Sequence, residues 1–250
     1  MGHPKDYFSA HAALYAARRP RYPQALFDWL AGVAPGRELA WDAGCGNGQA
    51  SLGLATRFAR VIATDPSAEQ IAAALAHPGV EYRVEPAEAP SLAPASADLV
   101  CIAQALHWFD LDRFHPEVHR VLRPGGRIAA CSYGLCRVDP AVDRVFMHLY
   151  EAVLGPWWPP ERRHVENGYR DLAFPYRHLD APPFILGQRW QLDHYLGYLR
   201  SWSATQRCLR DTGCDAVAEL AAEFAAAWGD PQSERDVSFP LALRVGRVEG

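Results

Sequence analysis

The chain has 250 residues, of which 49% are hydrophobic and 22% charged, and its formal net charge is −4. This length and composition suit one large globular domain, or one domain with a smaller cap. A nucleic-acid partner is not expected, because the balance is acidic and the two locally basic stretches, residues 17–23 and 161–164, are short.

No apolar run approaches the roughly 20 residues that a membrane-spanning helix requires, so no membrane partner is expected. The first 20 residues lack the apolar segment of a signal peptide, and the early Asp6 with few serines is unlike a transit peptide. The sequence therefore predicts a cytoplasmic protein. The six cysteines include no C-x-x-C pair and are expected to be free thiols. No metal is expected, because His115 and His119 would share a helix face without a third ligand nearby.

The pattern of apolar residues along the chain alternates strand-like and helix-like segments, which predicts an α/β fold with a doubly wound, mostly parallel, seven-stranded sheet. Strands are expected at residues 38–44, 60–65, 80–86, 97–105, 127–133, 183–192 and 237–248. Helices are expected at residues 48–59, 66–77, 112–126, 193–204 and 214–228.

The alternation stops at residue 138, where prolines, tryptophans and tyrosines become frequent up to about residue 183. We interpret this change as an inserted helical cap. The predicted organisation has three parts: an N-terminal helical lid (1–36), an α/β core (37–137 and 183–250) and a cap over the substrate pocket (138–182).

The segment from Ala40 to Ser51, AWDAGCGNGQAS, places three glycines at alternate positions directly after a predicted strand. A dinucleotide-binding turn, G-x-G-x-x-G, would need a small residue where this chain has Gln49. Asp42 stands two residues before the first glycine, where a carboxylate would repel a pyrophosphate and attract an ammonium or sulfonium group. The turn is therefore expected to bind a positively charged ligand.

A second carboxylate, Asp65, ends the second predicted strand about twenty residues beyond the glycines. A carboxylate at this place can accept hydrogen bonds from both hydroxyls of a ribose. NAD-dependent enzymes use the same device, so Asp65 alone does not separate the two classes of cofactor.

The motif DAGCGNG, residues 42–48, resembles motif I of the class I S-adenosylmethionine-dependent methyltransferases, whose fold is Rossmann-like. The resemblance implies S-adenosylmethionine as the cofactor and S-adenosylhomocysteine as its product. It implies that Asp42 lies close to the methionine part, and that the backbone of the turn approaches the methionine part and the ribose. The turn residues expected to bind the cofactor are Gly44, Cys45, Gly46 and Gly48.

The resemblance extends to two segments that would meet the adenine. Pro66 would stack near the adenine edge. In the segment VEPAEAPS after the third strand, Ala87 would offer its backbone N–H and Glu88 would lie near the exocyclic amine. The alternative for this segment is a solvated acidic loop.

The segment CIAQALHWFD, residues 101–110, carries polar and aromatic side chains directly after the most apolar strand. In the methyltransferase interpretation, the backbone carbonyl of Gln104 contacts the amino group of the cofactor. His107 then lies near the transferable methyl group, where it orients the acceptor or takes its proton, and Trp108 lines the acceptor site. A carboxylate acceptor needs no base. Alternatively, His107 closes the loop and Trp108 packs inside.

The segment Phe8–Leu30, together with YLRSWSATQR and FPLALRVGRV, resembles the trans-aconitate methyltransferase branch and its small-molecule relatives. Physically, Phe8, Tyr15 and Tyr22 are expected to cover the cofactor, with Tyr15 also a candidate catalytic residue. Arg18 or Arg21 would bind an anionic group of the acceptor. Aromatic residues of the cap and of the SWSA segment would form the outer wall of the pocket: Trp157, Trp158, Tyr169, Tyr176, His178 and Trp202.

The sequence thus predicts an enzyme (EC 2.1.1.-) that transfers a methyl group from S-adenosylmethionine to a small molecule, with a carboxylate or hydroxyl oxygen as the expected acceptor. An amine or carbon acceptor remains open, as does the choice between monomer and homodimer. The alternatives are an NAD-dependent oxidoreductase and a non-catalytic S-adenosylmethionine-binding protein. A tRNA or protein substrate is disfavoured by the acidic charge and the aromatic cap.

Overall fold

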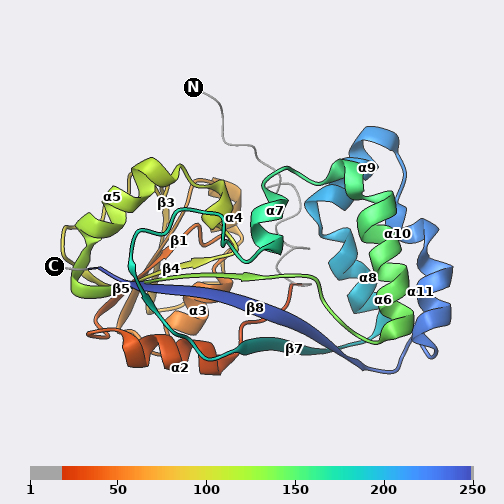
Figure 1. Ribbon diagram of the computed structural model, residues 1–250, viewed down its shortest axis with the longest axis horizontal. Coiled ribbons are helices and arrows are strands. Elements are labelled where there is room, and N and C mark those ends of the chain that lie inside the picture. The colour runs from red at the N-terminus through yellow and green to blue at the C-terminus, as the bar shows by residue number, and fades with distance from the viewer. Residues whose placement is uncertain (1–18, 249–250) are drawn as a thin grey trace. The chain divides into compact units, whose positions relative to one another are not determined.

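The computed structural model describes residues 19–248, which divide into two compact units (Figure 1). The sheet unit contains residues 22–134, 163–185 and 240–248. The helical unit contains residues 19–21, 135–162 and 186–239. Strands β7 and β8 each begin in one unit and end in the other, so the sheet continues along the chain from one unit into the other.

Within the described residues, the sheet has eight strands, and their order is β3-β2-β1-β4-β5-β8-β6, with β7 also paired to β8. Strands β1 to β5 run parallel to their neighbours, whereas β8 is antiparallel to β5 and β6 is antiparallel to β8. The strands are β1 (Leu39–Ala43), β2 (Arg60–Asp65), β3 (Val80–Val84), β4 (Ala97–Ala103), β5 (Leu122–Tyr133), β6 (Arg177–Leu179), β7 (Phe184–Trp190) and β8 (Arg235–Arg247).

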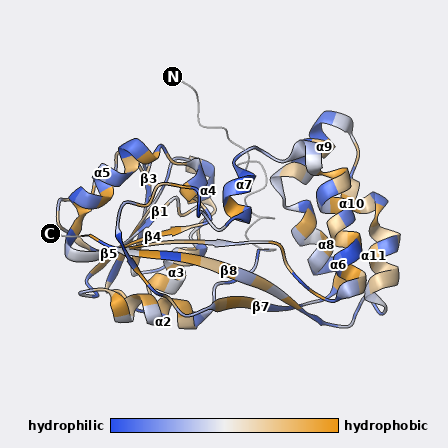
Figure 2. Cartoon of the chain, in the orientation of Figure 1, coloured by the Kyte–Doolittle hydropathy of each residue, from blue (hydrophilic) through white to orange (hydrophobic). Residues whose placement is uncertain are grey.

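Helices of the sheet unit cover both faces of the parallel strands, with α2 and α3 on one face and α5 on the other (Figure 1). Side chains alternate along β1, so Ala40 packs with α2 and α3 while Trp41 packs with α5. Both faces are therefore buried, and β1 and β4 are buried along almost their whole length, with Asp42 and Asp98 as the charged residues among them. The orange colour of β4 in Figure 2 marks its hydrophobic residues. The helical elements here are α2 (Gln24–Val33), α3 (Gln49–Leu54), α4 (Ala68–Ala72), η2 (Leu106–Trp108), α5 (Leu111–Val121) and α7 (Arg162–Glu166).

The helical unit has an aromatic core. Tyr195 packs against Phe224 and Trp228, and Trp202 packs against Phe146. Asp139 begins α6 by accepting hydrogen bonds from the backbone N–H groups of Ala141 and Val142. The elements are α6 (Pro140–Met147), η3 (His148–Val153), η4 (Gly155–Trp157), α8 (Leu192–Arg200), α9 (Ser203–Thr212), α10 (Ala216–Glu219) and α11 (Ala221–Trp228).

The predicted α/β class with a mostly parallel sheet is confirmed, and the boundaries differ in several places, three of which have a clear cause or consequence. The sheet gains β6, a three-residue strand whose exposed residues show no apolar alternation. The helix predicted to reach residue 126 ends at Val121, because Pro124 disfavours a helical backbone at the residue before it and the chain enters β5 at Leu122. The predicted helix 66–77 is reduced to α4.

The division into units also differs from the three predicted parts. Residues 163–185 belong with the sheet, and residues 186–239, which had been placed in the core, form most of the helical unit. The cap over a substrate pocket stays a prediction.

Asp98 joins the amino ends of the strands. Its buried carboxylate accepts hydrogen bonds from the backbone N–H groups of Glu38 (2.8 Å) and Leu39 (3.1 Å) and pairs with Arg123 at 2.9 Å. Asp98→Ala should therefore lower the free energy of unfolding by on the order of 3 kcal/mol. The matched control is Asp28→Ala on α2, where an exposed carboxylate pairs with Arg57 and a much smaller loss is expected. Urea unfolding would measure both, and equal losses would contradict this account of the amino edge.

Candidate active site

The carboxyl ends of the parallel strands bring the predicted site segments to one edge of the sheet, where ligands of doubly wound folds bind. β1 pairs with β2 on one side and β4 on the other, so the segments that follow these three strands are neighbours. They are the glycine turn (residues 44–48), Asp65 with Ser67, and residues 104–110.

The three glycines of the turn have positive φ values of 69°, 53° and 85°, a conformation that favours glycine. A Cβ atom at Gly44 would lie 2.6 Å from the Cβ of Ala105, and one at Gly48 would lie 2.2 Å from the hydroxyl of Tyr82. At Gly46 the nearest described atom would be the Oε1 of Gln70, at 3.7 Å. Packing therefore requires glycine at both ends of the turn, whereas its middle leaves room for a ligand to approach the backbone.

Asp65 ties the turn to the end of β2. Its carboxylate accepts hydrogen bonds from the backbone N–H groups of Gly46 and Ser67, both at 2.9 Å. The carbonyl of Thr64 accepts two more, from the N–H groups of Gly44 (2.8 Å) and Cys45 (2.9 Å). These hydrogen bonds hold Asp65, whose carboxylate is predicted to bind the ribose, next to the glycines.

Asp42 is fully buried on β1, and Ser51 donates a 2.6 Å hydrogen bond to its Oδ2. Its Oδ1 is buried without a hydrogen-bond partner among the described residues. Burial raises the pKa of Asp42 to about 7, against the smaller lowering effect of the Ser51 hydrogen bond. A cation next to Oδ1 would offset that cost. Burial also raises the pKa of the neighbouring Cys45 thiol, which keeps it neutral.

Gln104 follows β4 in a left-handed conformation, with φ of +59°, which is strained for a residue with a Cβ atom. Its backbone N–H bonds the carbonyl of Cys131 at 2.9 Å, and its Nε2 donates to the carbonyl of Tyr133 at 3.1 Å. The end of β4 is therefore held against the end of β5 from both backbone and side chain.

His107 lies in the 3-10 turn η2, half-buried, at the same edge. Its Nδ1 lies 3.0 Å from the hydroxyl of Tyr169, and the two rings are stacked at 5.7 Å. Trp108 is partly buried and its ring lies 4.6 Å from that of His107. Tyr169 had been predicted as part of an outer pocket wall, and the structure assigns it to the sheet unit as a partner of His107.

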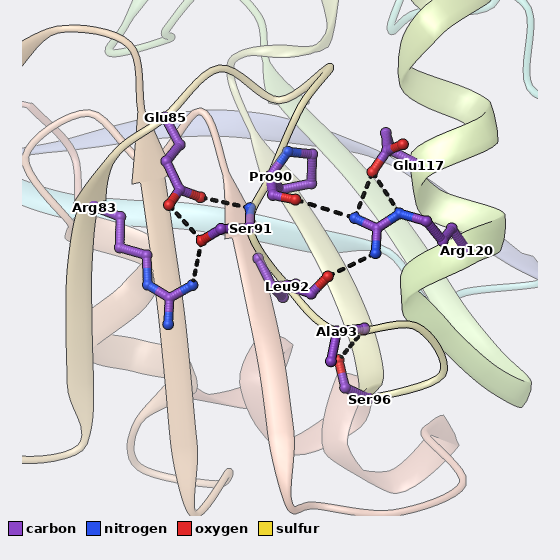
Figure 3. A network of polar contacts seen from close by, with 9 residues as sticks. All are labelled: Arg83, Glu85, Pro90, Ser91, Leu92, Ala93, Ser96, Glu117 and Arg120. Atoms are coloured by element: carbon purple, nitrogen blue, oxygen red, sulfur yellow. Dashed lines mark hydrogen bonds and ion pairs between the residues drawn. The ribbon is translucent and has the colours of Figure 1, made fainter.

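The segment predicted to meet the adenine is fixed from both sides. Ala87 is buried, and Glu88 accepts a 2.8 Å hydrogen bond from the backbone N–H of Asp110. Glu85 bonds both the N–H and the hydroxyl of Ser91 (Figure 3). From α5, Arg120 donates to the carbonyls of residues 90 and 92 (Figure 3). Pro66 is exposed after β2.

The other predicted site residues belong to different parts of the chain. Tyr15 and Arg18, as well as Phe8, are outside the described residues. Arg21 is exposed in the helical unit, and Trp202 is buried there in the aromatic core. Tyr22 belongs to the sheet unit, with its ring edge-on to Tyr133 at 6.2 Å.

Three polar residues that the sequence analysis had not named also lie at this edge: Asn47, Ser51 and Ser132. In the part of the chain that the structure describes, the buried side-chain atoms without a hydrogen-bond partner include Asn47 Nδ2, Gln104 Oε1 and Ser132 Oγ, besides Asp42 Oδ1. Buried polar atoms are rarely left unpaired, so this cluster indicates a polar ligand. Asn47 lies within the glycine motif, which assigns it no role, and Ser132 lies in no motif; the significance of both side chains comes from the absence of a protein partner.

Two further observations concern the histidine pair and the helices of the described chain. His115 uses both ring nitrogens on the protein, with Tyr176 Oη at 2.7 Å and the carbonyl of Ala173 at 3.2 Å. Residues 19–248 contain no group of three or more His, Cys, Asp or Glu side chains placed to hold a metal ion. Nor do they contain a helix both long and apolar enough to span a bilayer.

Comparison with known proteins identifies the class. Residues 41–130, which hold the glycine turn and the segments around it, match a family described as the methyltransferase domain. A Dictyostelium discoideum protein named as a methyltransferase is 31% identical over 251 residues, covering 98% of this chain and 95% of that protein. An uncharacterized methyltransferase of Mycobacterium tuberculosis is 40% identical over 122 residues, which is 48% of this chain and 49% of the relative.

Solved structures agree. A protein from Anaeromyxobacter dehalogenans, named as a type II methyltransferase, is 55% identical with a TM-score of 0.87, covering 92% of this chain and 98% of that one. An Anabaena variabilis protein named as a methyltransferase from an antibiotic biosynthesis pathway shares the fold, at 22% identity and a TM-score of 0.58. The fold and the glycine turn thus define a methyltransferase. The chain belongs to the class I S-adenosylmethionine-dependent methyltransferases, and S-adenosylmethionine is its cofactor.

The raised pKa of Asp42 predicts a pH-dependent loss of stability. Because its pKa is about 7 in the folded chain and 3.8 as a free group, the unfolded chain ionises first as the pH rises. The folded state therefore loses stability between about pH 4 and pH 7. Asp42→Asn removes this loss, and its advantage over the wild type should grow by on the order of 2–3 kcal/mol between pH 5 and pH 8. Unfolding of both proteins in the absence of ligand would measure this, and a constant difference would contradict the assignment.

Proposed function

We propose that the enzyme methylates a small molecule, and that the acceptor atom is a carboxylate or hydroxyl oxygen. The observation that carries the proposal is the group of unpaired polar atoms at the carboxyl ends of β1, β4 and β5, the edge of the sheet that also holds the half-buried His107. These atoms come from both donors and acceptors, so they suit a polar ligand. The acidic net charge argues against a nucleic-acid acceptor.

The residues at the turn fit S-adenosylmethionine. The unpaired Oδ1 of Asp42 suits the ammonium group of the methionine part, and the open approach at Gly46 suits close contact with the backbone. Asp65, held by Gly46 and Ser67, is proposed to accept hydrogen bonds from the ribose hydroxyls. Ala87, Glu88 and Pro66 are proposed to contact the adenine, and the carbonyl of Gln104 to contact the amino group.

When bound, S-adenosylmethionine supplies an electrophilic methyl group on a positively charged sulfur. The task of the protein is to align the acceptor with that group and to exclude water. We assign the alignment to His107, whose Nδ1 lies 3.0 Å from the hydroxyl of Tyr169. Trp108, beside the His107 ring, is proposed to line the acceptor site.

The partner of His107 bears on the choice of acceptor atom. A carboxylate at Nδ1 would raise the basicity of the imidazole, whereas the hydroxyl of Tyr169 is neutral. The ring is therefore better suited to orient an acceptor than to remove a tightly held proton. A carboxylate acceptor is already nucleophilic and needs no proton removed, so it fits this arrangement best.

Cofactor binding is tested first. The wild-type chain should bind S-adenosylmethionine and S-adenosylhomocysteine in isothermal calorimetry and should not bind NAD. Asp65→Ala should weaken both interactions by on the order of 1–3 kcal/mol, because hydrogen bonds to a charged group are lost. The control is Glu81→Ala, an exposed carboxylate on β3 that pairs with Arg83 at 2.6 Å. Equal affinities of the Asp65 variant and the wild type would remove Asp65 from the ribose site.

Acceptor handling is tested by screening carboxylic acids and then alcohols for transfer of a radiolabelled methyl group. His107→Ala should reduce turnover at least about tenfold while leaving cofactor affinity within about twofold, because the ring is proposed to contact the acceptor. Full activity of that variant would return His107 to a purely structural role. If amines are methylated in the screen and oxygen acceptors are not, the proposed acceptor class is wrong.

A further inference from the structure

Three arginines lie side by side on neighbouring strands of the sheet unit. Arg127 on β5 pairs with Arg247 on β8, and Arg247 pairs in turn with Arg177 on β6. Directly opposite residues of antiparallel strands point to the same face of a sheet, so the three side chains share one face. We call these three residues the arginine row. Like charges placed opposite each other destabilise a sheet, so the row lowers the stability of the fold.

The arginine row lies on the α2 face of the sheet, toward the amino end of β5. Ala129 and Val245, each two residues from a member of the row, belong to the core cluster that contains the buried residues of α2. Side chains two residues apart on a strand share a face, so Arg127 and Arg247 point to that side. Arg127 precedes Tyr133, the last residue of β5, by six positions, which is about 20 Å of extended strand. The row is therefore separated from the edge that carries the glycine turn.

Two of the guanidinium groups meet at the turn that precedes Arg127. The Nη1 of Arg127 donates a hydrogen bond to the carbonyl of Gly125. A Cβ atom at Gly125 would lie 3.9 Å from the Nη2 of Arg247. The Nε of Arg127 is buried and has no hydrogen-bond partner among the described residues. Arg127 thus has an unused donor next to a second cation.

Within residues 19–248, no carboxylate pairs with the arginine row, although Asp98 pairs with Arg123 on the same strand β5. Arg177 and Arg247 are exposed, and Arg127 is partly buried. Burial lowers the pKa of the Arg127 guanidinium, and the charge of Arg247 lowers it further. The row is therefore a local excess of positive charge on a chain whose formal net charge is −4.

We propose that the arginine row binds the phosphate groups of a small molecule that carries at least two of them in succession. A planar guanidinium donates two parallel hydrogen bonds, a geometry that matches phosphate oxygens. Neighbouring strands are about 4.8 Å apart, so the row spans about 10 Å and can contact two linked phosphates. A bound diphosphate offsets the repulsion within the row and gives the Nε of Arg127 an acceptor. Free pyrophosphate and the diphosphate part of a nucleotide share this chemistry.

Calorimetry tests the proposal on the full chain saturated with S-adenosylhomocysteine, so that the cofactor site is occupied. Pyrophosphate should bind at one site per chain, and Arg247→Gln and Arg177→Gln should each weaken this binding at least about tenfold. The control is Arg60→Gln at the start of β2, which removes the same charge from an exposed arginine paired with Glu81, and it should change the affinity less than about twofold. Absence of pyrophosphate binding to the wild type, or an equal loss in the control, would overturn the proposal.

Two further ligands define the chemical class. ADP carries the same diphosphate on a nucleoside, so tighter binding of ADP than of pyrophosphate, lost in both arginine variants, would identify a nucleotide as the ligand. Equal or weaker binding of ADP would identify the free diphosphate. Citrate, a polycarboxylate, should bind more weakly than pyrophosphate, and the reverse order would contradict the phosphate class.

The acidic residue Glu249 follows the arginine row in the sequence, so Glu249→Gln is measured in parallel. Pyrophosphate should bind this variant and the wild type alike. Binding that is present only in Glu249→Gln would mean that the chain supplies the anion itself, and it would overturn the proposal.

Thermal unfolding provides an independent measurement. Without pyrophosphate, Arg247→Gln should have a higher Tm than the wild type, because the substitution removes repulsion between like charges. Pyrophosphate should raise the Tm of the wild type, and it should raise that of Arg247→Gln much less. A lower Tm of the variant without ligand, or an equal rise in both proteins, would contradict the role given to the row.

Discussion

The parallel pairing of β1 between β2 and β4 is the constraint on which the site depends. It places Asp42 opposite Ala63 on one side and Cys101 on the other, so the chain leaves three neighbouring strands at one edge of the sheet. The segments that follow β1 and β4 are then hydrogen-bonded to the neighbouring strands β2 and β5. The glycine turn is bonded to Thr64 and Asp65, and Gln104 is bonded to Cys131 and Tyr133. These hydrogen bonds hold the ends of the strands together at the site.

The same edge carries the largest electrostatic cost that we identify in the sheet unit. A carboxylate buried with one unpaired oxygen disfavours its own ionisation, which is why the pKa of Asp42 rises to about 7. Replacement by asparagine is expected to stabilise the chain at neutral pH. Asp42 therefore favours the binding of a cation and lowers the stability of the folded chain, a combination that is common at functional sites.

The sequence predicted the parts of the fold that depend on local pattern. β1 and β2 are short apolar runs bounded by a turn and a charge, and their observed limits fall within one residue of the expected ones. The glycine turn was recognised because alternating glycines after a strand have few structural alternatives. The end of α5 and the extra strand β6 were wrong or missed because Pro124 acts on the residue before it and β6 depends on pairing with β8.

The site was predictable only in part. Asp42, Asp65 and Gln104 follow strands in a parallel sheet, so their proximity follows from topology. The contact of Tyr169 with His107 was not predicted, because the two residues are 62 positions apart and no sequence pattern links them. Ser51 and Ser132 were not named, since a serine acquires meaning from the partner that it has or lacks. The roles given to Tyr15 and Arg18 stay predictions, because these residues lie outside the described part of the chain.

The central claim is that the turn binds a cationic cofactor against the carboxylate of Asp42. The most direct measurement is the proton release that accompanies S-adenosylmethionine binding at pH 6, obtained by calorimetry in buffers of different ionisation enthalpy. With its pKa near 7, Asp42 is mostly protonated in the free protein and must ionise next to the ammonium group. We expect the release of about one proton in the wild type and almost none in Asp42→Asn. Binding that releases no proton in the wild type would contradict the account.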